Sequence, residues 1–392
     1  MLSFDTAPWP SYDESEVSAV ADVLRSNRVN YWTGTEGRAF EKEFARWIGT
    51  RHAVALANGT LALDAALAAL NLTPNDEVVV TPRTFIASIS SVVNAGARPV
   101  FADVDRNSGN IEAHTIEKVL TPRTRAVVPV HLGGFPCDMG PLLDLASSHD
   151  VAVVEDCAQA HGARWQGKPV GSLGLIGAWS FCQDKIMTTG GEGGMVTTDD
   201  AEVWSRIWSL KDHGKSWEAV YERDHPPGFR WLHESFGTNW RMIEMQAVIG
   251  RLQLAKMEQW TGARTRAAGR YAKIAAQFPD ALRVPEVRAG DTHAYYRFYC
   301  HVRPEGLRDG WTRDRIIDAV TSQGLPLFQG SCSEVYLEKA FEGSGFAPPQ
   351  RLPAATELGA TSLMFLTHPT LTDSDLDRIC NAFEATMSEA AA

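Results

Sequence analysis

Lys185 is the residue whose surroundings in the sequence most clearly predict chemistry. It follows an apolar run, and residues 190–194, shortly after it, include four glycines. Glycines let the backbone approach a ligand closely, and a lysine removed from water can attack a carbonyl group as a neutral amine and form a Schiff base. A lone lysine is more often a solvated surface charge, but this context favours a nucleophile.

Asp156 follows the apolar run 151–154, directly after Glu155. Ligands of open α/β sheets bind at the carboxyl ends of the strands, which is where this acidic pair falls. A carboxylate at that place can keep a pyridine nitrogen protonated and so turn the ring into an electron sink. The alternative is that Asp156 only caps the following turn.

The tripeptide Asn58-Gly59-Thr60 stands between an apolar strand pattern and an Ala/Leu-rich helix pattern. Such a turn directs free backbone N–H groups and the positive end of the helix towards one point, which suits a phosphate group. The alternative is an ordinary strand-to-helix turn with a threonine cap.

The elements that position these residues alternate between short apolar runs and helical patterns, as is typical of a mostly parallel sheet covered by helices. We predict strands, nearly continuous in apolar residues as doubly buried strands are, at 53–56, 78–81, 100–103, 126–130 and 151–155. Two further strands, 177–181 and 195–198, flank the glycine-rich loop and complete the sheet. The predicted helices are 14–24, 61–69, 85–94, 140–148 and a long segment, 244–278.

The length and composition predict two domains that share one cleft. The chain has 392 residues, of which 44% are hydrophobic, and this length exceeds what a single core usually serves. We expect a large ligand-binding domain over residues 1–250 and a smaller C-terminal α/β domain over residues 251–392.

The charge and cysteine patterns narrow the functional class. The net charge of −11 without a Lys/Arg cluster argues against a nucleic-acid or anionic-membrane surface. No apolar run approaches the roughly 20 residues that cross a bilayer, and no basic-then-apolar signal segment opens the chain. The six cysteines are scattered without a C-x-x-C pair, which fits reduced thiols in the cytoplasm, and we expect no metal centre.

Five motifs, in order along the chain, resemble those of the DegT/DnrJ/EryC1/StrS aminotransferases. These are fold-type I pyridoxal-phosphate enzymes, and most of them aminate nucleotide-linked ketosugars. The likeness runs from about residue 36 to about residue 254 and extends more loosely to both ends. The motifs are Asn58-Gly59-Thr60, Pro129-Val130-His131-Leu132-Gly133, Glu155-Asp156-Cys157-Ala158-Gln159-Ala160-His161-Gly162, Ser180-Phe181 with Lys185 and Gly191-Glu192-Gly193-Gly194, and Asn239-Trp240-Arg241-Met242.

The resemblance implies a role for each matching residue. Lys185 would carry the cofactor as a Schiff base and later move protons, Asp156 would pair with the pyridinium nitrogen, and Gln159 would contact the cofactor's ring face or phenolic oxygen. The other implied cofactor contacts are the phosphate ligands Gly59, Thr60 and Ser180, the stacking ring of Phe85, and Asn239, which would reach the phosphate in the neighbouring subunit of a homodimer. For Phe85, a core position on a helix is the alternative.

The resemblance also implies the reaction. L-Glutamate would give its amine to the enzyme, leaving pyridoxamine phosphate and 2-oxoglutarate, and a nucleotide-linked ketosugar would then receive the amine. A dehydrase branch of the family has histidine where this chain has Lys185, so transamination is favoured. Amination of a cyclitol, synthesis of an aminobenzoate, and a non-catalytic sensor remain alternatives, whereas a nicotinamide dehydrogenase is disfavoured because no G-x-G-x-x-G follows the first strand.

Two departures from the family pattern fall on the substrate side of the expected site. Gly133-Gly134 stands where many members have a tyrosine, and the loop after Lys185 has one extra glycine before its acid. Separately, Tyr31, Trp32 and His213 either line the sugar-nucleotide site or form a surface aromatic pair and a capping histidine.

Overall fold

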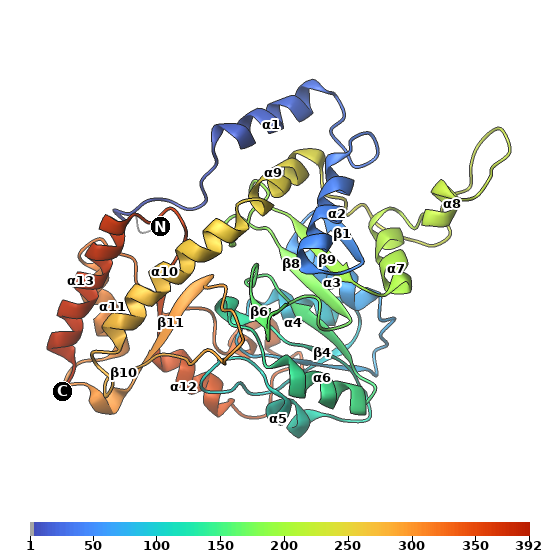
Figure 1. Cartoon of the computed structure of the whole chain (residues 1–392). Helices are drawn as coiled ribbons and strands as arrows, with labels where there is room; N and C mark the ends of the chain where they lie inside the picture. Colours follow the sequence, from blue (N-terminus) through green and yellow to red (C-terminus); the bar gives the residue numbers. More distant parts are fainter. Residues whose placement is uncertain (1–3) are drawn as a thin grey trace.

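The computed structural model describes residues 4–392, and at its centre is a seven-stranded sheet (Figure 1). Strand β9 is antiparallel to both of its neighbours, β1 and β8, while the pairs from β8 to β3 are all parallel. The carboxyl ends of every strand except β9 therefore meet at one edge. In spatial order the strands are β1 (His52–Leu56), β9 (Gly194–Thr198), β8 (Ile176–Ser180), β5 (Ala152–Asp156), β4 (Thr124–Val128), β2 (Glu77–Val80) and β3 (Arg98–Phe101).

Helices cover both faces of this sheet, and successive strand residues point to opposite faces. In β2, Val78 and Val80 pack into one core cluster and Val79 into another. Strands β2, β8 and β9 are buried along their whole length, as their apolar runs predict. The covering helices are α3 (Gly59–Ala68), α4 (Ala87–Asn94) and α7 (Ala201–Lys211) on one face, and α2 (Glu36–Ile48), α5 (Ala113–Ile116), α6 (Met139–Ser148) and α9 (Glu244–Leu254) on the other.

A second core lies around a three-stranded antiparallel sheet nearer the C-terminus (Figure 1). This arrangement bears out the expected α/β character of the C-terminal part, while the division after residue 250 stays a prediction. The strands are β10 (Leu282–Arg283), β11 (Arg297–Val302) and β12 (Ser362–Leu366), and the helices packed on them are α10 (Met257–Ala275), α11 (Arg313–Thr321) and α13 (Asp373–Ala390).

The long helix predicted over 244–278 is wrong in one respect, because it is two helices, α9 and α10, separated at Ala255 and Lys256. The predicted N-terminal helix is α1 (Glu14–Arg25), which Asp13 caps through a reciprocal hydrogen bond with Glu16. The remaining elements are α8 (Trp217–Tyr221), α12 (Pro353–Thr361), the hairpin β6 (Arg164–Trp165) and β7 (Lys168–Pro169), and the 3-10 turns η1 (Glu117–Val119), η2 (Leu132–Gly134), η3 (Pro304–Gly306), η4 (Val335–Leu337) and η5 (Lys339–Phe341).

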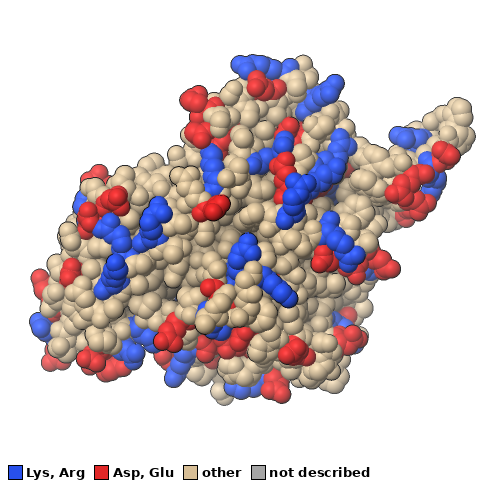
Figure 2. Space-filling view, in the orientation of Figure 1, with Lys and Arg blue, Asp and Glu red and all other residues tan. Residues whose placement is uncertain are grey.

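The surface is mixed in charge. Figure 2 shows acidic and basic side chains interspersed over the visible face. The segment that contains α8 extends away from the body of the molecule (Figure 1), and it carries three large exposed apolar side chains, Phe229, Trp231 and Phe236. In the described part of the chain, no helix combines the length and apolar character that crossing a membrane requires.

Candidate active site

The turn after β1 has the form of a phosphate site. Asn58 caps α3 by accepting the N–H of Leu61 at 3.0 Å, which leaves the helix-opening N–H groups of Gly59 and Thr60 for an external acceptor. A Cβ on Gly59 would lie 2.4 Å from the Cβ of Ser180, so only glycine permits the contact between this turn and the end of β8. Ser180, which the family resemblance implies as a phosphate ligand, is therefore held beside the turn.

Asp156 lies at the carboxyl end of β5 and is buried. Its Oδ2 accepts the hydroxyl hydrogen of Ser88 at 2.7 Å, and its Oδ1 accepts the N–H of Ala158 at 3.1 Å. Burial raises the pKa of Asp156, while these two hydrogen bonds and the charge of Lys185 act in the opposite direction. Ser88 was not predicted from the sequence, because a serine inside a helix carries no local signal for a contact with a strand 68 residues away.

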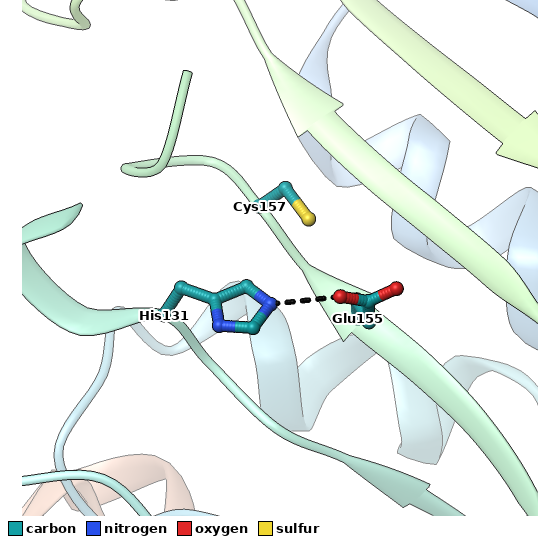
Figure 3. A group of neighbouring side chains, drawn as sticks. All are labelled: His131, Glu155 and Cys157. Carbon is teal, nitrogen blue, oxygen red and sulfur yellow. Dashed lines mark hydrogen bonds and ion pairs between the residues drawn. The ribbon is translucent and has the colours of Figure 1, made fainter. Parts of the chain in front are cut away.

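The side chains of His131, Glu155 and Cys157 lie together where β4 and β5 end (Figure 3). His131 Nε2 lies 3.0 Å from Glu155 Oε2, and the N–H of Cys137 donates to His131 Nδ1 at 3.0 Å. With Nδ1 turned to this N–H group, Nε2 is the ring nitrogen that faces the Glu155 carboxylate. Burial raises the pKa of the Cys157 thiol to about 12, so this sulfur stays protonated.

The same three side chains, His131, Glu155 and Cys157, lie close enough together to suggest a metal site. However, Oε1 of Glu155 accepts the N–H groups of Leu173 and Gly174 at 2.8 and 2.7 Å, and Oε2 accepts that of Gly171 at 2.9 Å. Both carboxylate oxygens thus already accept hydrogen bonds from backbone N–H groups. These contacts hold the end of β5, the strand that carries Asp156, in place.

Lys185 emerges from the turn that follows β8, and its side chain is 16% exposed. The Nζ atom lies 3.8 Å from Asp184 Oδ1 and 5.2 Å from the centre of the Tyr296 ring. The backbone carbonyl of Lys185 accepts a hydrogen bond of 2.9 Å from Trp9 Nε1, which fixes the turn from the N-terminal segment. Neither Trp9 nor Tyr296 is predicted from the sequence, in which the two prolines beside Trp9 are the only local signal of an ordered segment.

Gln159 is buried and points to the turn η2. Its Oε1 accepts the N–H of Gly133 at 2.7 Å. Gly133 and Gly134 have φ values of 63° and 91°, and a Cβ on Gly133 would lie 2.9 Å from Tyr299 Cε2. The glycine pair that departs from the family pattern is therefore required by the left-handed backbone and by the approach of β11.

Phe85 and Asn239 both reach the surface. The Phe85 ring is 70% exposed after β2, so the alternative of a core phenylalanine is excluded. The Asn239 side chain is exposed while its backbone pairs with Asp212, and the next residue, Trp240, accepts the N–H of Ala57 through its carbonyl at 2.9 Å. The segment of Asn239 thus lies beside the strand end that leads into the phosphate turn.

Both interpretations of Tyr31 from the sequence are wrong, because its side chain is 1% exposed and lies in the interior. Its hydroxyl donates to Glu41 at 3.0 Å, and a lysine lies over its ring. Trp32 is half-buried and stacks on Tyr221, whereas His213 is exposed with φ of 59°. The sequence around an aromatic residue beside a polar turn does not indicate whether its side chain is buried or exposed.

Comparisons with known proteins agree with this geometry. The aminotransferase from Psychrobacter cryohalolentis, known from an X-ray structure, is 56% identical, with a TM-score of 0.97 over 98% of this chain and 99% of that chain. GDP-perosamine synthase from Caulobacter vibrioides is 36% identical over 387 residues, which span 95% of this chain and 98% of that protein. The dTDP-3-amino-3,4,6-trideoxy-alpha-D-glucose transaminase of Streptomyces venezuelae is 36% identical over 93% of this chain and 90% of that protein.

The family model of the DegT/DnrJ/EryC1/StrS aminotransferases matches residues 10–384. This match confirms the resemblance found in the sequence and the expected fold class. The chain belongs to the DegT/DnrJ/EryC1/StrS aminotransferase family and is a pyridoxal-phosphate-dependent aminotransferase.

Proposed function

We propose that the protein transfers an amino group from L-glutamate to a nucleotide-linked ketosugar, at a site built from the carboxyl edge of the seven-stranded sheet. The observation that carries the proposal is that a lysine, a buried aspartate and a helix-opening turn, far apart in the sequence, meet at that edge. The relatives named above support the substrate class, because two of them make amino sugars linked to GDP or dTDP.

The residues fit the cofactor of the family. The free N–H groups of Gly59 and Thr60 and the hydroxyl of Ser180 would hold its phosphate, since the absence of a Cβ at Gly59 lets Ser180 lie directly against this turn. The exposed ring of Phe85 offers a stacking surface, and Gln159, held by η2, would contact the cofactor's ring or phenolic oxygen. When bound, pyridoxal phosphate supplies an electron sink for the carbon next to the amine.

Lys185 and Asp156 would control where protons are held and moved during the reaction. The Lys185 amine is the group that removes a proton from the α-carbon of the donor and delivers one to the sugar carbon. The Asp156 carboxylate would keep the pyridine nitrogen protonated, and its own position is fixed by Ser88 and Ala158. Both roles rest on Asp156 ending β5 and on Lys185 standing in the turn that follows the adjacent strand, β8.

The test of the proposed function is a panel of nucleotide-linked 3-keto and 4-keto sugars incubated with L-glutamate and the enzyme, with product mass as the readout. We expect one class of sugar to gain an amine with formation of 2-oxoglutarate, and Lys185→Ala to lose at least about 10²-fold in rate while binding cofactor non-covalently. Amination of a cyclitol or a cyclohexanone in place of every sugar would overturn the substrate class.

Asp156→Asn separates cofactor binding from rate. The amide keeps the size of the side chain but cannot stabilise a pyridinium as a carboxylate does, so we expect full cofactor occupancy with most of the rate lost. An unchanged rate at full occupancy would reduce Asp156 to a turn cap.

We also propose a homodimer in which Asn239 of one subunit contacts the phosphate in the other. The exposed Asn239 side chain and the apolar side chains of the protruding segment support an interface there. Mixing inactive Lys185→Ala and inactive Asn239→Ala proteins under conditions of subunit exchange should recover part of the activity. An active monomer in sedimentation at assay concentration would refute the shared site.

We also propose that the protein acts in the cytoplasm. The six free cysteines support this, because disulfides are rare in that compartment.

A further inference from the structure

Arg83 is a buried arginine that has no ionic partner within residues 4–392, and it lies outside the cofactor contacts described above. It follows β2 and is 2% exposed. Its Nη2 donates to Ser362 Oγ at 3.2 Å at the start of β12, whereas its buried Nε has no acceptor among residues 4–392. A buried charge that lacks a counter-charge destabilises the folded protein. An anion bound beside the Arg83 guanidinium would remove this cost.

The Arg83 side chain lines a small cavity between the two sheets. Other lining residues include Leu132, Tyr299 and His301. The cavity volume of about 30 Å³ is room for one or two water molecules or a single halide ion, and it is too small for a phosphate or a dicarboxylate. The guanidinium lies over the Tyr299 ring, 5.7 Å from its centre.

A second arginine lies near Arg83, and the carboxylates of Glu357 and Asp105 lie near that second arginine. Arg283, on β10, also has a buried nitrogen, Nη1, without a partner in the described chain. Burial and the charges of Arg83 and Arg283 hold the pKa of His301 well below its usual value, so this imidazole is neutral. Burial likewise lowers the pKa of His293, another lining residue, to about 3. Neither histidine adds a charge, and the lining contains no carboxylate.

We propose that this cavity is an internal binding site for a small monovalent anion of the size of chloride, held by Arg83. The position of this site, close to segments that reach the cofactor site, suggests what a bound anion would do. Arg83 stands two residues before Phe85, and Tyr299, on the opposite wall, packs against Gly133, which holds Gln159. A bound anion would therefore join the second sheet to two segments that reach the cofactor site. The site does not depend on the identity of the sugar substrate.

Bromide is the direct probe, because it replaces chloride and gives an anomalous diffraction signal. Crystals of the holoenzyme grown or soaked in bromide should show one anomalous peak beside the Arg83 guanidinium. Water alone in the cavity at saturating bromide would overturn the proposal, whether or not any variant folds.

The solution test compares thermal unfolding of the holoenzyme in sodium chloride and in sodium gluconate at equal ionic strength. We expect chloride to raise the Tm of the unaltered protein by about 2 °C, because a ligand that binds only the folded state stabilises it. Arg83→Met should abolish the chloride-specific rise, and Arg83→Lys should retain part of it. Arg25→Met, which removes an exposed arginine on α1, is the matched control and should retain all of it. An equal rise in Arg83→Met would refute the site.

Discussion

The buried ion pair between Lys211 and Glu41 allows a quantitative test of what holds the helices to the sheet. Lys211 on α7 is fully buried, and its Nζ lies 3.0 Å from Glu41 Oε1 on α2 and 3.7 Å from the centre of the Tyr31 ring. Glu41 also accepts the N–H of Ala55 in β1 at 2.9 Å. The pair therefore connects two helices, one on each face, to the strand that leads into the phosphate turn.

Removing one partner leaves the other charge buried and uncompensated, which costs about 3–5 kcal/mol in the free energy of unfolding. We expect losses of this size for Lys211→Met and for Glu41→Gln. The double variant removes both charges and keeps a polar acceptor for the Ala55 N–H, so its loss should be well below the sum of the two single losses.

The assay is urea unfolding followed by circular dichroism, at fixed protein and cofactor concentrations because both bind the folded state. A double-mutant cycle with a coupling energy of several kcal/mol is expected. Additive losses, or single losses under about 1 kcal/mol, would show that the pair acts like an exposed one and would refute the reasoning. Arg25→Met, in an exposed pair on α1, is a control that should leave the unfolding midpoint unchanged.

Three further changes test individual contacts. Ser88→Ala removes a donor to Asp156, and we expect kcat to fall by about tenfold or more with a changed pH profile, measured by steady-state kinetics. Trp9→Phe keeps an aromatic ring but loses the donor to the Lys185 carbonyl, so cofactor should dissociate more readily in absorbance titrations, and unchanged affinity would contradict the role. Burial alone would raise the pKa of Glu77, but hydrogen bonds from a neighbouring threonine and arginine lower it overall, so its stabilising effect is present above its usual pKa and lost as the pH falls. Glu77→Gln should therefore flatten the fall of Tm towards acid pH.

Much of the fold was predictable because its signals are local. The seven predicted strands correspond to the seven strands of the central sheet, since apolar runs of that length between turns are typical of doubly buried strands. The reversed direction of β9 was not predictable. A strand's residue pattern is the same in either direction, and only its pairing with both β1 and β8 shows the orientation.

The residues of the candidate site likewise fall into those that the sequence predicts and those that it does not. Lys185 and Asp156 stood out because each follows an apolar run and precedes a turn, and the fold brings both to one sheet edge. Ser88 and Trp9 did not stand out, because their partners lie 68 and 176 residues away. Tyr31 was misassigned because its burial depends on helices that come later in the chain.

By itself, the sequence determined the order of strands and helices, the family, and the residues whose chemistry needs only a strand end or a turn. These follow from backbone preferences and apolar periodicity over a few residues. The tertiary structure alone decided which buried side chains have no ionic partner in the described part of the chain, such as Arg83, and which donors reach Asp156 and Lys185. Such contacts join segments far apart in the chain, and their geometry is set by how the sheets and helices pack together.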